Sequence, residues 1–282
     1  MPIGPARMPL LDHLGELRMR LVRIVAVLVI AIIVFYFATP TIIDFLINPI
    51  RDSLPTDASG NAILNVLDPL EAFSVRFSVS FWASIVATSP IIIWQILAFF
   101  LPALKPKERK WFIPTFIAAT ALFIIGTLFC YFIILQPAFA WLTDQAMGIV
   151  QVDARASSYV DIIIKFEIGF GFAFELPLVV FYLTVFGVIP YAKLRAQWRI
   201  VYTVLIVLSA MITPDASPVT MLLMFAALIV LYEGSLFMSR IVLGKEKIKA
   251  QAEEAAARAA EEAEMQAEWE EHKAKRRAER DA

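Results

Sequence analysis

The sequence predicts an all-α integral membrane protein with six transmembrane helices. Of its 282 residues, 60% are apolar and 18% are charged, and the mean hydropathy is +0.72. A water-soluble domain has about 45–50% apolar and about 25% charged residues, so this composition indicates a chain that folds in lipid. Two further observations support this prediction: several apolar runs are long enough to cross a bilayer, and Lys and Arg gather in alternate connections between them.

The apolar runs define the predicted helices in chain order. A helix needs about 20 residues to cross the hydrocarbon layer. Four runs meet that length: 24–38 with an amphipathic approach from Leu17, then 77–101, 113–135 and 162–189. Two more runs, 200–212 and 219–232, hold only 13 and 14 residues and flank the helix-breaking stretch 213–218. We expect either a hairpin that stops short or a bilayer that thins around it, and both return the chain to the side that it left.

The basic residues predict the orientation. Fifteen Lys and Arg lie in the N-terminal segment, the 102–112 and 190–199 connections and the stretch 240–249, against three in the connections on the other side. Because Lys and Arg are retained in the cytoplasm, we expect both termini to be cytoplasmic. On the outer side, Asp68-Pro69-Leu70-Glu71 predicts a helix start, with Asp68 as N-cap and Pro69 in the first helical position.

The charges also predict three regions. Residues 1–244 hold 31 charged side chains, whereas the last 38 residues hold 20. We therefore expect a cytoplasmic amphipathic N-terminus at 1–20, a six-helix membrane domain at 21–244 and a charged cytoplasmic helical tail at 245–282. In that tail, Glu254→Arg258 and Glu271→Lys275 are spaced to stabilise a solvated helix.

The sequence gives no indication of an enzyme. Two histidines and one cysteine are too few for the usual zinc or iron–sulfur site. The P-loop, dinucleotide-binding and H-E-x-x-H patterns do not occur. We expect no cofactor, no metal site and no catalytic residue.

Ionisable residues within the apolar runs are the first candidate functional residues. Glu175 lies near mid-membrane, two positions before Pro177, and an intramembrane carboxyl usually faces protein or water. It can be a protonated group bonded to a neighbouring helix, or a polar contact for an inserting partner, or a proton-handling group. For Lys165, Glu167 and Arg76, and for Glu233 at the inner end of the last run, a structural contact is the more favoured interpretation.

Two carboxylates at the predicted cytoplasmic face are the second candidates. Glu16 and Glu108 stand among cations, and topology alone does not require acids there. A carboxylate can bind a guanidinium through two parallel, charge-assisted hydrogen bonds. Either each acid pairs with a neighbouring Arg or Lys, or both receive a guanidinium from another molecule.

Several motifs together resemble the TatC family, the polytopic core of the twin-arginine protein translocase. They are His13-Leu14-Gly15-Glu16-Leu17-Arg18, the 98–109 stretch with Phe99, Pro102, Leu104 and Glu108, and Phe174-Glu175-Leu176-Pro177. Thr213-Pro214 and Leu231-Tyr232-Glu233 fit the same pattern. The resemblance spans about residues 8–244.

The resemblance implies a concave, glove-like bundle with two short last helices, in the bacterial cytoplasmic (inner) membrane. It implies a receptor for folded precursors with Arg-Arg signal peptides, driven by the proton-motive force. Carried over by position, Glu16, Arg18, Phe99, Leu104 and Glu108 form the signal-peptide surface, and Glu175 is the polar residue of the concavity. Thr213 and Thr220 mark where single-span partners similar to TatA and TatB dock. Self-association is also expected, and nucleic acid is not.

Two other functions remain open at the level of sequence. A proton-coupled small-solute transporter would use Glu175 in its proton relay, although the chain lacks the internal repeats of common transporters. An intramembrane enzyme would need paired acids, a Ser–His pair or a metal cluster at membrane depth, and the sequence offers none of these.

Overall fold

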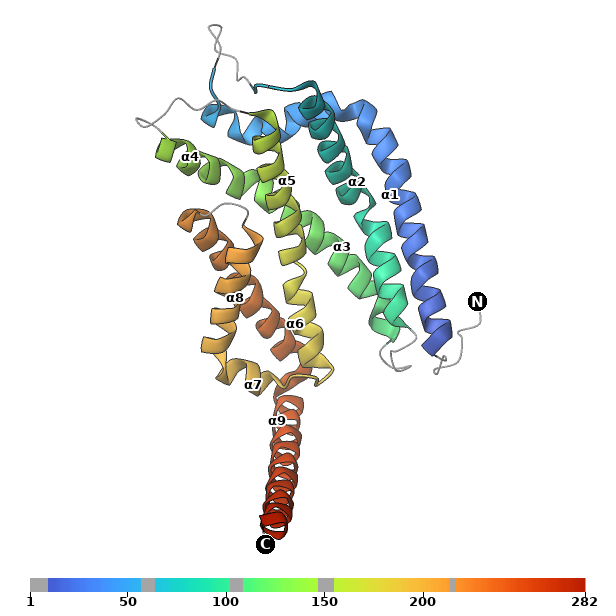
Figure 1. Ribbon diagram of the computed structural model, residues 1–282, viewed down its shortest axis with the longest axis vertical. Helices are drawn as coiled ribbons and strands as arrows, with labels where there is room; N and C mark the ends of the chain where they lie inside the picture. Colours follow the sequence, from blue (N-terminus) through green and yellow to red (C-terminus); the bar gives the residue numbers. More distant parts are fainter. Residues whose placement is uncertain (1–9, 57–63, 102–108, 147–154, 214–216, 282) are drawn as a thin grey trace.

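The structure is a computed structural model that describes residues 10–56, 64–101, 109–146, 155–213 and 217–281. Among these residues all regular elements are helical, apart from an isolated bridge between Asn65 and Arg155. Figure 1 shows most helices running along one long axis, with the start of α1 at the lower end of the bundle, where the tail of α9 also projects. In chain order the elements are α1 (Leu10–Ile47), η1 (Asn48–Ser53), α2 (Pro69–Phe100), η3 (Arg109–Trp111), α3 (Phe112–Phe129), η4 (Cys130–Ile134), α4 (Leu135–Ala146), α5 (Ala156–Ala173), α6 (Leu176–Val185), α7 (Tyr191–Ala196), α8 (Trp198–Ile212) and α9 (Pro218–Asp281).

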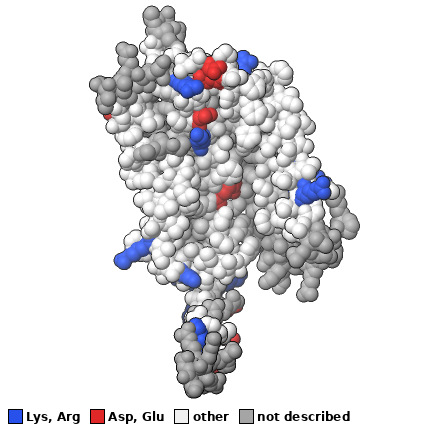
Figure 2. All heavy atoms as spheres, viewed as in Figure 1, with Lys and Arg blue, Asp and Glu red and all other residues white. Residues whose placement is uncertain are grey.

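The helices have the length and composition of membrane spans. Five helical stretches of the described chain are long and apolar enough to cross a bilayer: His13–Ser53, Pro69–Phe100, Arg109–Gln145, Ala156–Val185 and Pro218–Ala257. The sixth predicted run, α8, is apolar but has 15 residues. Large apolar side chains lie on the outside, such as Phe37 at 82% and Phe132 at 69% exposure, and Figure 2 shows few charged side chains over the middle of the bundle. Such a surface requires a lipid solvent. The structure thus confirms the predicted all-α integral membrane fold.

Several helices are longer than their apolar runs predict. The run 24–38 was expected to end before Pro40, yet α1 continues through that proline to Ile47. The run 113–135 continues through the π-helical η4 into α4. The last run does not stop at Tyr232, because α9 continues to Asp281 with one non-helical residue, Gly244 (φ 68°). After that kink, the Gln251 side chain donates to the Thr184 carbonyl at 3.1 Å and holds the start of the tail against the end of α6.

A hydroxyl beside each proline explains why α1 and α2 continue. Proline lacks an N–H, so it leaves the carbonyl four residues earlier without its helical partner. In α1 the Thr39 hydroxyl donates to the Tyr36 carbonyl, the one that Pro40 frees, at 2.8 Å. In α2 the Ser89 hydroxyl donates at 2.8 Å to the Val86 carbonyl, which Pro90 frees. Serine and threonine commonly restore such bonds in lipid, so both helices cross their prolines intact.

The α5–α6 junction shows the opposite case. Pro177 frees the carbonyl of Ala173, but the residue before this proline is Leu176, which has no hydroxyl. Helix α5 ends at Ala173 and α6 begins at Leu176. Phe174 and Glu175 form the junction, in which the Glu175 N–H bonds to the Phe172 carbonyl at 3.1 Å. The break places Glu175 at a turn in the middle of a membrane-spanning stretch.

A buried carboxylate ties together the ends of the connections that precede α2 and α5. Glu71 is 5% exposed and accepts hydrogen bonds from Arg155 Nε at 2.9 Å and from the Ser157 hydroxyl at 2.6 Å. It also accepts from the Leu67 N–H at 3.0 Å. The predicted helix start is confirmed, because Asp68 caps α2 by accepting from the Leu70 N–H. Together these bonds fix the start of α2 against the start of α5.

Helices α3 and α5 cross very closely. A Cβ atom on Gly126 would lie 2.6 Å from the Phe170 carbonyl oxygen, and one on Gly171 would lie 2.8 Å from the Phe123 ring. Small residues allow this approach between membrane helices. The crossing holds the Phe123 ring beside α5, where it lines the groove described below.

We predict that the Thr39 hydroxyl, which also contacts the Ser80 hydroxyl of α2 at 3.1 Å, stabilises the fold more strongly while Pro40 is present than without it. Thr39→Val should lower the free energy of unfolding in detergent by about 1–2 kcal/mol, because it leaves the Tyr36 carbonyl unpaired. In a Pro40→Ala background the restored N–H pairs that carbonyl, so the same substitution should cost clearly less. Thr203→Val is the matched control, because that hydroxyl is exposed on α8. Equal costs in both backgrounds would contradict the explanation.

Candidate functional site

The first group of predicted site residues meets at the end of the bundle that carries both termini (Figure 1). Glu16 on α1 accepts hydrogen bonds from Arg20, one of them from Nε at 3.1 Å. Arg20 reaches on to Gln95 of α2, with Nη1 at 3.3 Å from its Oε1. The His13 ring stacks on Phe99, with centroids 4.2 Å apart. The last turn of α2 and the first turns of α1 therefore form one polar and aromatic rim.

The two Glu16 oxygens are used differently. Oε1 is held by Arg20, while Oε2 is buried and has no hydrogen-bond partner among the described residues. His13 Nδ1 lies 3.9 Å from it, beyond hydrogen-bond distance. Buried polar atoms almost always have a partner, so Oε2 retains an unused capacity to accept. Of the two alternatives expected from sequence, the ion pair with a neighbouring arginine is present at Oε1. Oε2 remains able to accept a hydrogen bond from another molecule.

The other predicted rim residues are not brought together in the same way. Arg18 is exposed on α1 and makes no ion pair with a described residue. Leu104 and Glu108 lie outside the described residues. Their contribution therefore depends on the sequence alone.

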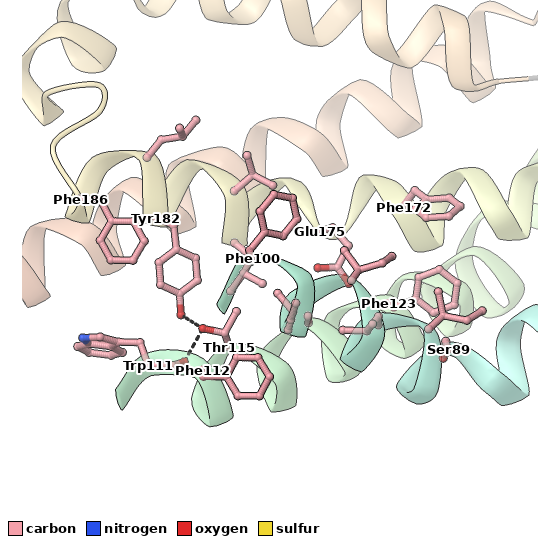
Figure 3. Close-up of a pocket in the computed structure, with 18 of the residues that line it drawn as sticks. Ser89, Phe100, Trp111, Phe112, Thr115, Phe123, Phe172, Glu175, Tyr182 and Phe186 are labelled. Carbon is pink, nitrogen blue, oxygen red and sulfur yellow. Dashed lines mark hydrogen bonds between the residues drawn. The ribbon is translucent and has the colours of Figure 1, made fainter. Parts of the chain in front are cut away.

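An apolar cavity of about 600 Å³ begins beside this rim. We call it the aromatic groove; α2, α3 and α6 form its walls, and its lining includes Phe100, Trp111, Phe123, Phe172, Tyr182 and Phe186. Figure 3 shows these rings around the cavity, with the Glu175 carboxylate directed into it. Near the rim, Tyr182 and Thr115 are hydrogen-bonded, and Thr115 donates to the Trp111 carbonyl. The groove thus runs from the aromatic end of α2 to a carboxyl at membrane depth.

A second cavity of about 680 Å³ lies on the other side of the same junction. We call it the hairpin groove, because α8 and α9 form one wall through Leu208, Met211, Ile212 and Leu228. Glu175, Phe172 and Val179 line both grooves. Glu175 is half-buried, and its Oε1 is buried with no hydrogen-bond partner among the described residues. The sequence expectation of an intramembrane polar residue in a concavity therefore corresponds to a carboxyl between two apolar grooves.

The residues expected to receive partner helices are already engaged inside the hairpin. Thr213 and Thr220 are buried, and their hydroxyls donate to the carbonyls of Ser209 and Ser217. Any docking at this site would therefore involve the surface around them rather than their hydroxyls.

Glu233 has the structural role that the sequence favoured. It accepts from Arg195 through both carboxylate oxygens, at 3.0 and 2.8 Å, and from the Tyr202 hydroxyl at 2.9 Å. These bonds join α7, α8 and α9 near the terminus-bearing end of the bundle. Glu167 is also buried, at 2% exposure, and lines neither groove.

Sequence reasoning missed the groove residues and the role of Arg20. The spacing of Glu16 and Arg20 at i and i+4 was a readable signal for their pairing. The groove had no such signal, because Trp111, Thr115 and Tyr182 come from helices whose contacts only the tertiary structure fixes. Among the described residues, no group of three His, Cys, Asp or Glu could hold a metal ion.

The fold and the site define a polytopic α-helical membrane protein with a polar rim that leads into an apolar, lipid-depth groove. A model of the family "Sec-independent protein translocase protein (TatC)" matches residues 12–226. The chain belongs to the TatC family.

Relatives and solved structures agree with this assignment. The chain is 35% identical over 245 residues to the TatC protein of Aquifex aeolicus, covering 85% of this chain and 98% of that one. It is 32% identical over 236 residues to TatC of Deinococcus radiodurans, covering 84% and 87% respectively. A crystal structure of the "Twin Arginine Translocase Receptor- TatC" superposes with a TM-score of 0.68 at 30% identity, covering 82% of this chain and 100% of that chain.

Proposed function

We propose that this protein is the receptor and core subunit of a twin-arginine translocase in a bacterial inner membrane. It binds the Arg-Arg signal peptides of folded precursors and assembles with single-span partners similar to TatA and TatB. The proton-motive force drives export, and the chain itself catalyses no reaction. The observation that supports this most strongly is the aromatic groove, which begins beside the rim of Glu16 and Phe99 and passes the Glu175 carboxyl.

Recognition begins at the rim. A guanidinium from the signal peptide binds Glu16 either at the unpaired Oε2 or by exchanging with Arg20 at Oε1, and Glu108 binds the second guanidinium. Both bonds are charge-assisted and can be bidentate. Exchange with Arg20 makes binding selective, because a weaker donor would not offset the loss of an existing ion pair. The Phe99 ring, stacked on His13, forms the apolar side of this rim, and Leu104 and Arg18 complete it.

The apolar stretch that follows the arginines then enters the aromatic groove. A groove of about 600 Å³ accepts several apolar side chains from one face of a helix or extended segment. Burial of each methylene group contributes about 0.8 kcal/mol when the peptide arrives from water. The Glu175 carboxyl within the groove accepts a hydrogen bond from a backbone or side-chain donor that lipid would leave unpaired.

The basic connections support the membrane orientation of this proposal. Up to residue 249, fifteen Lys and Arg lie on the side of the termini, and the first turns of α1 and the last turn of α2, which form the rim, lie at the same end (Figure 1). With that end in the cytoplasm, six crossings place Glu16 and Phe99 where precursors are made. Single-span partners, and a second copy of this chain, then dock from within the bilayer, the partners along α8 and α9 near Thr213 and Thr220.

We predict that the two rim carboxylates act together. Glu108→Lys should abolish detectable binding of an Arg-Arg signal peptide to the full chain in lipid vesicles. Glu16→Gln alone should weaken binding by roughly tenfold, the value of one charge-assisted hydrogen bond. Arg20→Gln is the matched control, because it removes the internal competitor and should leave binding equal or stronger. Normal crosslinking and export of a twin-arginine precursor by the Glu16→Ala, Glu108→Ala double variant would contradict the assignment.

We predict that Glu175 acts in deep insertion and not in folding. Glu175→Ala should keep its level in the membrane and its melting temperature, because Oε1 gives up no hydrogen bond to a described residue. It should lose about tenfold in crosslinking between the groove and the apolar part of the signal, whereas Glu175→Gln should lose less. Thr203→Ala, exposed on α8 and outside both grooves, is the control. Unchanged insertion together with lost proton-coupled solute uptake would instead support a small-solute transporter.

A further inference from the structure

The hairpin groove contains a charged residue that the recognition of signal peptides does not use. Lys165 lies on α5 and lines this groove with its side chain exposed. It lies nine residues into α5, about 14 Å along the helix axis, well inside a span. Among the described residues it makes no ion pair. Asp161, one turn nearer the start of α5, is the nearest acid along that face.

Lys165 and Glu175 form two polar points on one apolar stripe. Lys165, Ile168, Phe172, Glu175 and Val179 follow each other at helical spacing and all line the hairpin groove. Ten residues separate Lys165 from Glu175, which corresponds to about 15 Å, or about three turns, along a helix. The wall opposite is apolar, formed by Leu208, Met211 and Leu228.

An unpaired cation facing lipid in a span is costly, at about 2.5–3.5 kcal/mol on insertion scales. Lys165 can reduce this cost by extending toward the interface, but a carboxylate arriving in the groove would remove it more completely. A membrane helix that carries an unpaired carboxylate has a similar free-energy cost, with the opposite charge. The two charges therefore favour each other, and a helix with a cation at the same depth is disfavoured.

We propose that the hairpin groove receives one transmembrane helix of a partner that carries a carboxylate, which pairs with Lys165, and a hydrogen-bond donor about three turns away, which bonds to Glu175. Lys165 is then a specificity-determining residue for the partner. This inference rests on the proposed assembly with single-span proteins and adds the chemistry that selects among them. The apolar wall of α8 and α9 supplies the packing surface around Thr213 and Thr220.

Charge reversal tests the proposal with a defined probe. The full chain is placed in lipid vesicles with synthetic Leu–Ala transmembrane peptides of about 21 residues. One peptide carries a Glu and, ten residues away, a Gln; the matched peptide has Lys in place of that Glu. Association is measured by energy transfer. The unmodified chain should prefer the Glu peptide by roughly three- to tenfold, and Lys165→Glu should reverse the preference.

Two variants provide the controls. Arg76→Glu reverses an exposed charge on α2 outside both grooves and should leave the preference unchanged. Asp161→Asn removes the nearby acid and should leave it equal or stronger. The proposal is overturned if Lys165→Glu keeps the preference for the Glu peptide, or if Arg76→Glu changes it as much.

Binding of an Arg-Arg signal peptide to the same vesicles separates this inference from the proposed function. Signal binding with no charge-dependent choice of helix overturns only the inference. If the unmodified chain does not bind the signal peptide, the receptor function is overturned. A reversed peptide preference in Lys165→Glu would then still support the pairing proposed for the hairpin groove.

Discussion

The absence of water inside a bilayer is the constraint on which this structure depends. Each backbone or side-chain polar group at membrane depth must find its partner within the chain or in another molecule. Most of the described groups find it within the chain. Thr39 and Ser89 restore the carbonyls that Pro40 and Pro90 free, and Glu233 is bound by Arg195 and Tyr202. Polar groups that lack a partner are therefore informative, because each of them destabilises the protein in the absence of water.

The exceptions include groups at the rim and at the two grooves, whereas others, such as Glu167 Oε1 and Trp82 Nε1, are buried elsewhere in the bundle. Glu16 retains a buried oxygen without a partner, and so does Glu175. Lys165 faces the hairpin groove without an ion pair in the described part of the chain. A folded protein keeps such groups where function requires them, and an incoming molecule can supply what each one lacks. The three residues can bind different groups: Glu16 a guanidinium at the rim, Glu175 a hydrogen-bond donor at the α5–α6 junction, and Lys165 a carboxylate in the hairpin groove.

The sequence predicted the fold class and the positions of the apolar helices, because composition and run length report directly on the solvent. It misplaced helix ends where local chemistry overrides a general rule. A proline normally ends a helix, but the hydroxyl of Thr39 or Ser89 replaces the lost bond, while Leu176 before Pro177 cannot. For these three prolines the preceding residue differs, so the sequence could have predicted that the helices continue through Pro40 and Pro90 and break near Pro177. The grooves could not be predicted, because they arise where Phe123, Tyr182 and Leu228 are set side by side by distant crossings, among them the close contact at Gly126.

The path from the rim to Glu175 is the central claim, and position-specific photocrosslinking tests it most directly. A photoreactive residue is placed in turn at Phe99, at Tyr182 in the aromatic groove and at Phe37 on the lipid-facing side of α1, and a labelled twin-arginine precursor is added. The account predicts that Phe99 captures the segment around the arginines, that Tyr182 captures the apolar stretch after it, and that Phe37 captures neither. Capture from Phe37 as strong as from Tyr182, or the reverse order along the signal, would contradict it.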